Sequence, residues 1–297
     1  METLKGKVTV DAMFDRMQLK LLPFEGFMPH LAIIRVGANP ADVSYEKGAK
    51  KRMEKVGIRV STYEFEADVS MEDFAAAFKF INDDDDVDGI LLFCPLPKQL
   101  DEKKIREMID PAKDVDGISP INQAKVFAGD ESGFAPCTAE AVMEVLKDAR
   151  IDLTGKEVAI IGRSMVVGRP LSMLMLRANA TVTVCHTKTV DMEKVCSRAD
   201  ILVSCAGKAK LVNASYVKED AVVIDVGINE DENGKMVGDV DFEDIKDVAC
   251  KATPVPGGIG TVTTSVLAMR VINAALARRD VESMALRNGT EDPYLVD

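Results

Sequence analysis

Two glycines near the middle of the chain could form a phosphate-binding turn. Gly162 and Gly168 lie in the segment IIGRSMVVGRP, between the apolar run EVAIIG and a helical pattern. At such a strand-to-helix turn, backbone N–H groups and the helix N-terminus can face a pyrophosphate. The spacing differs from the G-x-G-x-x-G fingerprint of dinucleotide-binding folds. Taken alone, the turn is therefore equally compatible with a nucleotide site and with an ordinary strand-to-helix connection.

The next strand pattern supports a dinucleotide. The run TVTVCH leads into Cys185-His186-Thr187, where such folds usually meet the adenosine ribose. An acidic residue there would hydrogen-bond a ribose 2′-OH and repel a 2′-phosphate. No Asp or Glu ends this strand, and Arg163 lies nearby in the turn. The sequence therefore favours NADP over NAD.

Metal-ligating residues are sparse. The only histidines are His30 and His186, so a His-based metal site would need carboxylates for its other ligands. The six cysteines contain no C-x-x-C pair, and several lie in apolar strand-like runs, which favours buried free thiols. They are Cys94, Cys137, Cys185, Cys196, Cys205 and Cys250. We predict no metal.

Composition and charge exclude several classes of function. The 297 residues are 47% hydrophobic and 29% charged, which excludes disordered and collagen-like chains. The net charge of −12 disfavours nucleic acid and anionic lipid as partners. No apolar run approaches the roughly 18 residues of a membrane-spanning helix, and the N-terminus lacks a secretion signal. We therefore expect a cytoplasmic protein with no nucleic-acid or membrane partner. A basic group could attract a small anionic substrate, although a solvated helix face explains it equally well. It consists of Lys47, Lys50, Lys51 and Arg52.

Apolar runs alternate with helical patterns along the chain, which predicts an α/β fold with parallel sheets covered by helices. The length suggests two domains. The strand candidates are LAIIRVG, VSTYEFEA and GILLFCPLP in the first half, and EVAIIG, TVTVCH, DILVSCAG and AVVIDVG in the second.

Local signals add detail to this outline. Ser70 and Asp73 form a capping pair that opens a helix. Asp83–Asp86 lacks a spaced ligand pattern and is predicted to be a solvated loop. We expect the tail from Arg287 on to be loosely ordered or partner-dependent. A final helix carries one apolar stripe, made of Val266, Met269, Ile272 and Leu276.

Segments spread over nearly the whole chain resemble the methylenetetrahydrofolate dehydrogenase/cyclohydrolase family. They are VGANPADVSY, CPLPK, IDPAKDVDGISPIN and PCT in the first half, and GRSMVVGRPLSMLML, NATVTVCHTKT, AVVIDVGIN, GDVDF and TPVPGGIGTVT in the second. They occur in colinear order, and DVDG together with TPVPGG is highly specific. The sequence is therefore identified as a member of this family.

The resemblance implies a two-domain α/β enzyme with its active site in the cleft between the domains. Residues 1–148 would form a folate-binding catalytic domain, completed by the C-terminal helix 265–286. Residues 149–264 would form a Rossmann-type dinucleotide-binding domain. Family members are usually homodimers, so we expect a homodimer that takes a small-molecule folate substrate.

The activity that the resemblance implies has two steps. A dehydrogenase moves a hydride from 5,10-methylenetetrahydrofolate to NAD(P), which leaves 5,10-methenyltetrahydrofolate. A cyclohydrolase then adds water and gives 10-formyltetrahydrofolate. The first step needs two ring systems in close contact, whereas the second needs a polar group that handles protons.

The resemblance also assigns site residues. Tyr45 would line the folate site, where a phenol can stack and hydrogen-bond. Asp116 of DVDG would bind the pterin ring, whereas Asp114 would brace the turn. Further substrate contacts would come from Pro95, Leu96, Pro256, Gly257 and Gly258. The cofactor contacts would come from Gly162, Arg163, Ser164, Val167, Gly168, His186, Thr187, Ala206, Gly207, Gly227 and Ile228.

The sequence departs from the family pattern at two single positions and in one short segment. The catalytic lysine four residues after the tyrosine reads Ala49, and its glutamine partner reads Phe93. The family's Gly-Pro-Met-Thr reads Gly-Thr-Val-Thr at residues 260–263. Loss of both members of the proton-handling pair predicts a retained dehydrogenase and a weak or absent cyclohydrolase.

Lys50 leaves an alternative open and joins Tyr45 and Asp116 as a catalytic candidate. It lies about 100° further round a helix, so it replaces the missing amine only if the helix shifts or its side chain bends back. A full bifunctional enzyme that uses Lys50 is thus one alternative, and a binding-only folate or nucleotide protein is another. A Rossmann-type dehydrogenase of a shikimate-like acid would not explain DVDG and TPVPGG. Some monofunctional family members are NAD-linked, so NAD stays an alternative cofactor.

Overall fold

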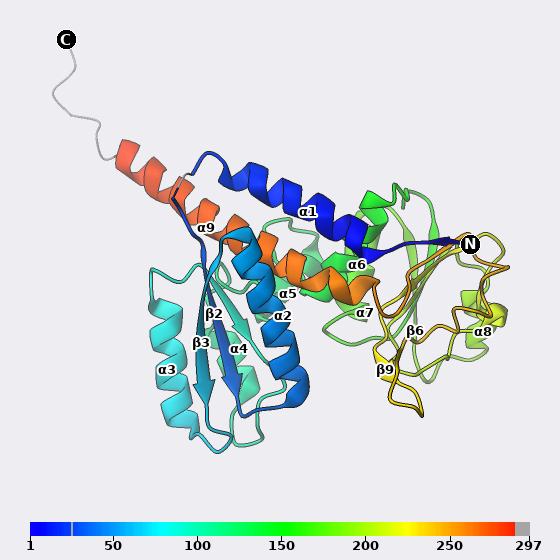
Figure 1. The fold of residues 1–297 in the computed structure, drawn as a ribbon, viewed down its shortest axis with the longest axis horizontal. Coiled ribbons are helices and arrows are strands. Elements are labelled where there is room, and N and C mark those ends of the chain that lie inside the picture. Colours follow the sequence, from blue (N-terminus) through cyan, green and yellow to red (C-terminus); the bar gives the residue numbers. More distant parts are fainter. Residues whose placement is uncertain (25, 289–297) are drawn as a thin grey trace, which may run out of the picture. The chain divides into compact units, whose positions relative to one another are not determined.

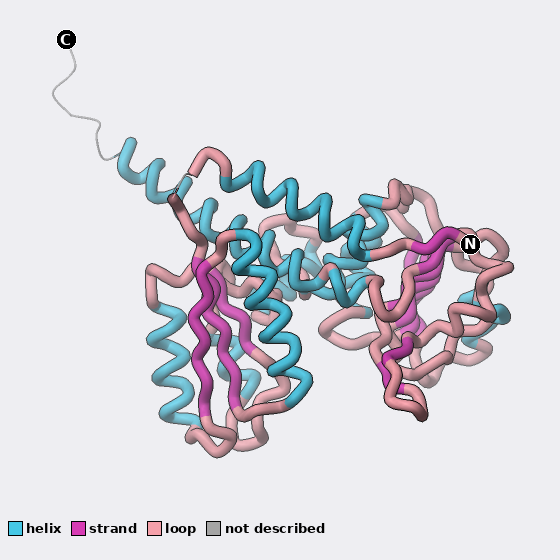
Figure 2. Tube along the Cα trace, in the orientation of Figure 1, coloured by secondary structure: helices cyan, strands magenta, loops and turns pink. Residues whose placement is uncertain are grey.

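The computed structural model describes the backbone of residues 1–24 and 26–288 and the side chains up to residue 279, in two compact units (Figure 1). The six-stranded unit comprises Met1–Arg16 and Asp116–Val266. The three-stranded unit comprises Met17–Val115 and the chain from Leu267 on. Strand pairing is parallel except in one short pair, and helices connect the strands (Figure 2), which confirms the α/β class. The predicted boundary between a folate-binding domain that ends at residue 148 and a dinucleotide-binding domain that begins at residue 149 stays a prediction.

The three-stranded unit is built around a buried central strand. Its sheet has the order β3 (Arg59–Phe65), β2 (His30–Val36) and β4 (Gly89–Leu92), all parallel. The run LAII in β2 is continuously apolar because helices cover both faces of the sheet. Those helices are α2 (Pro40–Val56) after β2 and α3 (Met71–Asp83) after β3. The two right-handed crossovers step in opposite directions, so the helices lie on opposite faces (Figure 1).

Capping side chains define the ends of these helices. The Asn39 side chain accepts a hydrogen bond from Ala41 N at 2.9 Å at the start of α2, and Gly57 with φ 85° ends that helix. Ser70 Oγ accepts from Asp73 N at 3.1 Å, which confirms the predicted capping pair. α2, which carries the catalytic candidates Tyr45 and Lys50, is therefore capped at both ends.

The acidic turn after α3 is braced by basic side chains. The side chains of Asp83, Asp85 and Asp86 are exposed, as predicted for a solvated loop, but Asp84 is half-buried and Asp83 is the last residue of α3. The backbone of the turn is held nonetheless. Lys113 Nζ donates to two carbonyl oxygens of segment 82–87 at 2.7 Å, and Arg278 donates to two more at 2.8 Å. The run of four aspartates is thus ordered by cations that bind its carbonyl groups.

The six-stranded unit carries a parallel sheet with short edge strands. Its order is β1 (Glu2–Thr3), β11 (Lys251–Ala252), β8 (Val222–Asp225), β7 (Ile201–Ser204), β5 (Glu157–Ile161) and β6 (Thr181–Cys185). The four predicted strands of the second half are confirmed as β5 to β8. The other elements are α5 (Pro120–Ala128), α6 (Cys137–Asp148), α7 (Gly168–Arg177), α8 (Met192–Cys196) and the antiparallel pair β9 (Asn229–Glu230) and β10 (Met236–Val237). The three-stranded unit adds α4 (Glu102–Met108).

The cysteines are free thiols, as expected. Cys137, Cys185 and Cys196 are buried, and the other three are half-buried. Over the described residues, no group of three or more His, Cys, Asp or Glu side chains is placed to hold a metal ion.

The long C-terminal helix is more apolar than the sequence analysis indicates. α9 (Thr263–Asn288) lies largely within a 21-residue stretch, Ile259–Arg279, which is long and apolar enough to cross a membrane. However, 67% of its apolar window is buried inside the protein. Val266 and Ile272 of the predicted stripe are among its buried residues. The composition of this helix is therefore explained by its place in the core. The helix reaches Asn288, and the rest of the predicted loose tail lies outside the described residues.

Candidate functional site

The glycine turn lies where the order of the parallel sheet reverses. β5 is flanked by β6 on one side and β7 on the other, so successive strands are added in opposite directions from β5. Ligands of open α/β sheets bind outside the carboxyl ends of the strands at such a point. The turn from Gly162 to Gly168 follows β5 and opens α7. The fold therefore places the predicted phosphate-binding turn where such folds bind ligands.

Close backbone contacts require both glycines. Gly162 has φ 128°, and a Cβ there would lie 2.5 Å from the carbonyl oxygen of Cys205. A Cβ at Gly168 would lie 2.1 Å from the carbonyl oxygen of Gly162. Ser164 Oγ accepts a hydrogen bond from Val167 N at 3.1 Å across the turn. The result is a closely packed turn that leads into the N-terminus of a ten-residue helix, a position that can face a phosphate.

The neighbouring strand end carries no acidic side chain. The His186 backbone N–H donates to Thr189 Oγ1 at 2.8 Å, and His186 Nδ1 accepts from Lys188 N at 3.1 Å. Thr187 and Arg163 are exposed. A strand end without an acid, next to an exposed guanidinium, is compatible with a 2′-phosphate.

Two buried carboxylates join the loops after β7 and β8. Asp239 accepts from the backbone N–H of Ala206 at 2.7 Å and of Gly207 at 3.2 Å. Asp225 accepts from Gly227 N at 2.9 Å. Burial raises the pKa of Asp225 to about 6, although backbone hydrogen bonds oppose that shift. Sequence reasoning missed both residues, although the segments AVVIDVGIN and GDVDF contain them.

The loop Pro254–Gly258 packs on the start of α1 (Gly6–Leu21). Gly6 N donates to the carbonyl oxygen of Gly257 at 2.9 Å. A Cβ at Gly6 would lie 2.3 Å from the carbonyl oxygen of Gly258. Gly257 has φ 100°, and Pro256 is exposed. This loop, which is predicted to meet substrate, is therefore fixed through its backbone.

In the three-stranded unit, the rings of Tyr45 and Phe93 lie edge to face, with centroids 6.0 Å apart and an interplanar angle of 83°. Tyr45 is a half-buried residue of α2, and Phe93 follows β4. Ala49 lies one turn after Tyr45 and is fully buried. Ala49 and Phe93, which replace the lysine and glutamine of the family, thus both lie next to Tyr45, the tyrosine predicted to line the folate site.

Lys50 belongs to an ionic network centred on a buried acid. Its Nζ lies 2.6 Å from Glu46 Oε1, and Arg35 Nε donates to Glu46 Oε2 at 2.9 Å. Arg35 also pairs with Glu64 at 3.0 Å. Burial opposes ionisation of Glu46, but the hydrogen bonds from Lys50 and Arg35 outweigh it and lower the pKa of this carboxyl. Lys50, which is the candidate to replace the missing catalytic lysine, is therefore paired with Glu46.

The remaining substrate candidates come from both units. In the three-stranded unit, Pro95 precedes Leu96, whose N–H donates to Glu102 Oε2 at 2.7 Å. Asp116 belongs to the six-stranded unit, and its Oδ1 accepts from Cys137 N at 3.2 Å.

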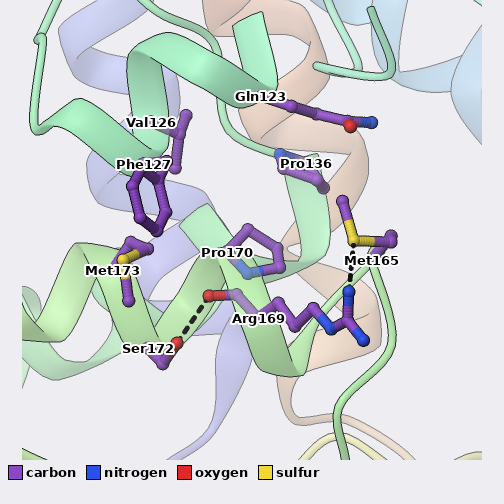
Figure 3. A pocket seen from close by; sticks show the side chains of 9 residues that line it. All are labelled: Gln123, Val126, Phe127, Pro136, Met165, Arg169, Pro170, Ser172 and Met173. Carbon is purple, nitrogen blue, oxygen red and sulfur yellow. Dashed lines mark hydrogen bonds between the residues drawn. The ribbon is translucent and has the colours of Figure 1, made fainter. Parts of the chain in front are cut away.

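An unpredicted pocket of about 310 Å³ lies beside the glycine turn (Figure 3). α5 and α7 form it together with Met165 of the turn, whose Sδ accepts a hydrogen bond from Arg169 Nη1 at 3.5 Å. Sequence reasoning could not find it because these helices meet only in the fold. Its walls are Gln123, Val126, Phe127, Pro136, Met165, Arg169, Pro170, Ser172 and Met173.

Family models match most of the chain. Residues 4–116 match the catalytic domain of tetrahydrofolate dehydrogenase/cyclohydrolase, and residues 136–279 match its NAD(P)-binding domain.

Individual relatives agree with this match. The bifunctional protein FolD of Clostridium kluyveri is 51% identical over 273 residues, which are 91% of this chain and 96% of the relative. The crystal structure of the bifunctional enzyme FolD, a methylenetetrahydrofolate dehydrogenase/cyclohydrolase from Campylobacter jejuni, is 41% identical with a TM-score of 0.90, and covers 94% of this chain and 99% of that one. FolD of Trypanosoma brucei, solved with NADP cofactor and inhibitor, is 31% identical with a TM-score of 0.84, and covers 93% of this chain and 95% of that one. With its glycine turn at the sheet reversal and these matches along its length, the chain belongs to the tetrahydrofolate dehydrogenase/cyclohydrolase family.

Proposed function

We propose that the protein is a methylenetetrahydrofolate dehydrogenase that prefers NADP to NAD and whose cyclohydrolase activity is weak or absent. Family membership supports the dehydrogenase step. The observation that carries the finer proposal is the arrangement around Tyr45, where position 49 is a buried alanine and Phe93 packs against the phenol ring. The two relatives named above as bifunctional are the standard against which this difference is tested.

The carboxyl ends of β5 and β6 fit a dinucleotide with a 2′-phosphate. Gly162 and Gly168 let the backbone of the turn pack closely on itself and on Cys205, and α7 begins at Gly168, where a helix N-terminus can face a pyrophosphate. Arg163 and Thr187 would hold the 2′-phosphate through a charge-assisted and a neutral hydrogen bond. NAD would lose both contacts. When bound, the nicotinamide supplies the acceptor for the hydride of the folate.

Tyr45 and Asp116 would orient the folate. The Asp116 carboxylate can accept hydrogen bonds from the N–H and amino groups of a pterin, and Tyr45 offers a ring and a hydroxyl group. Pro95, Leu96 and residues 256–258 would supply apolar and backbone surface that excludes water. Hydride transfer depends mainly on how the rings are positioned, so these residues meet its needs without a proton carrier.

The cyclohydrolase step lacks the groups that would handle its protons. Ala49 has no amine, and Phe93 places an apolar ring where the family has an amide. Lys50 is the neighbouring amine, but it pairs with Glu46 at 2.6 Å. If Lys50 moved to the folate site, the buried carboxylate of Glu46 would lose one of its two cationic partners. This cost opposes the use of Lys50 in place of the family's lysine.

The test measures both activities in one preparation. Dehydrogenation is followed by the absorbance of the reduced nicotinamide with each cofactor. Cyclohydrolysis is followed by the loss of methenyltetrahydrofolate absorbance after subtraction of the uncatalysed rate. We expect wild type to dehydrogenate with NADP and to hydrolyse roughly 10²–10⁴-fold more slowly than the double variant Ala49→Lys, Phe93→Gln, because positioned proton transfer contributes that much.

Lys50→Ala is the matched control and should leave both rates unchanged. Fast hydrolysis by wild type that Lys50→Ala abolishes would instead establish a bifunctional enzyme that uses Lys50. No reduced nicotinamide with either cofactor would favour a binding-only protein. Tighter binding of NAD than NADP, or an unchanged preference in Arg163→Ala, would contradict the cofactor assignment.

The proposal includes a cytoplasmic homodimer, which is the usual assembly of the family. Light scattering coupled to size-exclusion chromatography measures the mass, and the mass of a single chain would contradict the dimer.

A further inference from the structure

Asp239 is fully buried, and its carboxylate accepts hydrogen bonds only from neutral groups among those that the structure gives it. The backbone N–H groups of residues 206–208 donate to it at 2.7, 3.2 and 2.9 Å. Ser204 Oγ donates at 2.9 Å, and Asn229 Nδ2 donates at 3.0 Å. One carboxylate thus connects the end of β7, the loop after it and the segment after β8.

A second buried carboxylate holds the first in place. Asp225 Oδ1 accepts from Gly227 N at 2.9 Å and from Asp239 N at 3.0 Å, and its Oδ2 accepts from Val240 N at 2.9 Å. The Asp225 backbone N–H donates to Thr253 Oγ1 at 2.7 Å. Asp225 therefore fixes the backbone that carries Asp239 to the end of β8.

Two glycines make room for these carboxylates. A Cβ at Gly227 would lie 2.2 Å from Asp239 Oδ1, and a Cβ at Gly238 would lie 1.8 Å from Asp225 Oδ2. Both distances are far below a van der Waals contact. A side chain at either position would displace the carboxylate from its donors.

The hydrogen bonds to Asp239 determine what the loop after β7 can offer a ligand. Ala206 and Gly207 are exposed, but their N–H groups donate inward to the carboxylate. The carbonyl oxygen of Lys208 accepts from Leu211 N at 3.3 Å, so the carbonyl oxygens of Ala206 and Gly207 are the acceptors that this loop can offer to hydroxyl and amide hydrogens. Ile228, which follows Gly227, is 65% exposed and adds apolar surface. The backbone N–H groups of the loop after β7 are thus not available to a phosphate.

We propose that Asp239 is a positioning residue for the part of the dinucleotide that carries no phosphate. Its carboxylate turns the N–H groups of residues 206–208 inward, so that the carbonyl oxygens of Ala206 and Gly207 receive the ribose hydroxyl and carboxamide hydrogens. The inference rests on the proposed function, because it takes these loops as the cofactor site.

Asp239→Asn tests this role, because it replaces a carboxylate oxygen with an NH₂ group that faces N–H and O–H donors. We expect the Kd for NADPH, measured by nicotinamide fluorescence without substrate, to rise about 10- to 100-fold. The KM for NADP should rise with it, while the KM for methylenetetrahydrofolate stays unchanged. If Asp239 had only a structural role, the variant would be less stable, but the KM for NADP would not rise selectively over the KM for methylenetetrahydrofolate.

Asp241→Asn is the matched control, since Asp241 lies two residues further on and pairs with Lys210 at 3.6 Å. Its Kd should stay within about twofold of wild type. Asn229→Asp serves if Asp239→Asn does not fold, because it puts a carboxylate against Asp239 in place of a donor and should also weaken NADPH binding.

The outcomes separate this role from the proposed function. Unchanged NADPH binding in a folded Asp239→Asn variant, or in Asn229→Asp where that variant replaces it, overturns the role and leaves the dehydrogenase intact. A wild type that binds neither NADPH nor NADH overturns the proposed function, and this role with it.

Discussion

Glu46 in the three-stranded unit and Asp239 in the six-stranded unit are both buried acids, with 5% and 0% exposure, but they are held differently. Glu46 is paired with two cations, Arg35 and Lys50. Asp239 accepts from neutral donors, most of them backbone N–H groups. Pairing with cations holds the side chains of Arg35 and Lys50 at Glu46, whereas hydrogen bonds from backbone N–H groups fix the course of the main chain around Asp239. The ion pair with Glu46 therefore holds the Lys50 amine beside the predicted folate site, and the hydrogen bonds to Asp239 set the conformation of the loop after β7.

The pKa directions reflect the same contrast. Cationic partners lower the pKa of Glu46 despite its burial. The hydrogen bond to Glu46 raises the pKa of Arg35 in turn. In the carboxylate pair of the six-stranded unit, burial dominates and raises the pKa of Asp225 to about 6. The two regions should therefore respond differently to the loss of a partner and to pH.

The largest effect is expected from Arg35→Ala. Its guanidinium is buried, and its removal leaves Glu46 buried with Lys50 as the remaining cation of the network. We expect the free energy of unfolding, measured by urea denaturation, to fall by about 3–5 kcal/mol. Replacing Arg35 and Glu46 together by methionine should recover most of that loss, because no buried charge is left unpaired. A loss below about 1 kcal/mol in the single variant would show that Glu46 does not depend on this partner.

The pH dependence of Asp225→Asn should be the next largest effect. The pKa of Asp225 is about 6 in the fold and 3.8 in the reference state, so folding takes up a proton between these values. The stabilisation by protonated Asp225 is complete below the lower value and is lost as pH rises through about 6. Wild type should therefore lose on the order of 3 kcal/mol relative to Asp225→Asn between acidic and neutral pH. Urea denaturation across this range measures it, and parallel stability curves for the two proteins would disprove it.

The smallest expected effects compare two glycines. Gly238→Ala places a Cβ 1.8 Å from Asp225 Oδ2 and should cost about 1–3 kcal/mol of unfolding free energy and weaken NADPH binding. Gly48 in α2 has no heavy atom within 4 Å of the built Cβ, so Gly48→Ala should stabilise by about 0.5–1 kcal/mol. Thermal unfolding ranks the two variants. Equal effects would mean that the close approach to the carboxylate does not matter.

Periodicity predicted the interior of both sheets because strands covered on both faces are continuous apolar runs. LAIIRVG became β2, and EVAIIG became β5. The same reasoning could not find β1 and β11, which are two residues long and pair across most of the chain. Strands this short show no period, and only the sheet that they join defines them.

Site prediction had the same limit. Gly162 and Gly168 were predicted as a turn because the strand and helix they connect are adjacent in sequence. Asp239 was missed because its partner Ala206 lies 33 residues away. The direction of Lys50 follows from helix geometry, but its commitment to Glu46 and Arg35 depends on how β2 and α2 pack.

The edge strand β1 can pair only late during synthesis, because its partner strand β11 lies near the C-terminal end of the sequence. Glu2 and Thr3 pair with Lys251 and Ala252. At about 5–20 residues per second, the N-terminal strand waits on the order of 10–50 s at the ribosome before its partner is made. In that interval Met17–Val115 is already complete, so the sheet of the three-stranded unit can form while β1 is still an open edge. A domain fused before Met1 would therefore have to leave this strand accessible until nearly the whole chain has been translated.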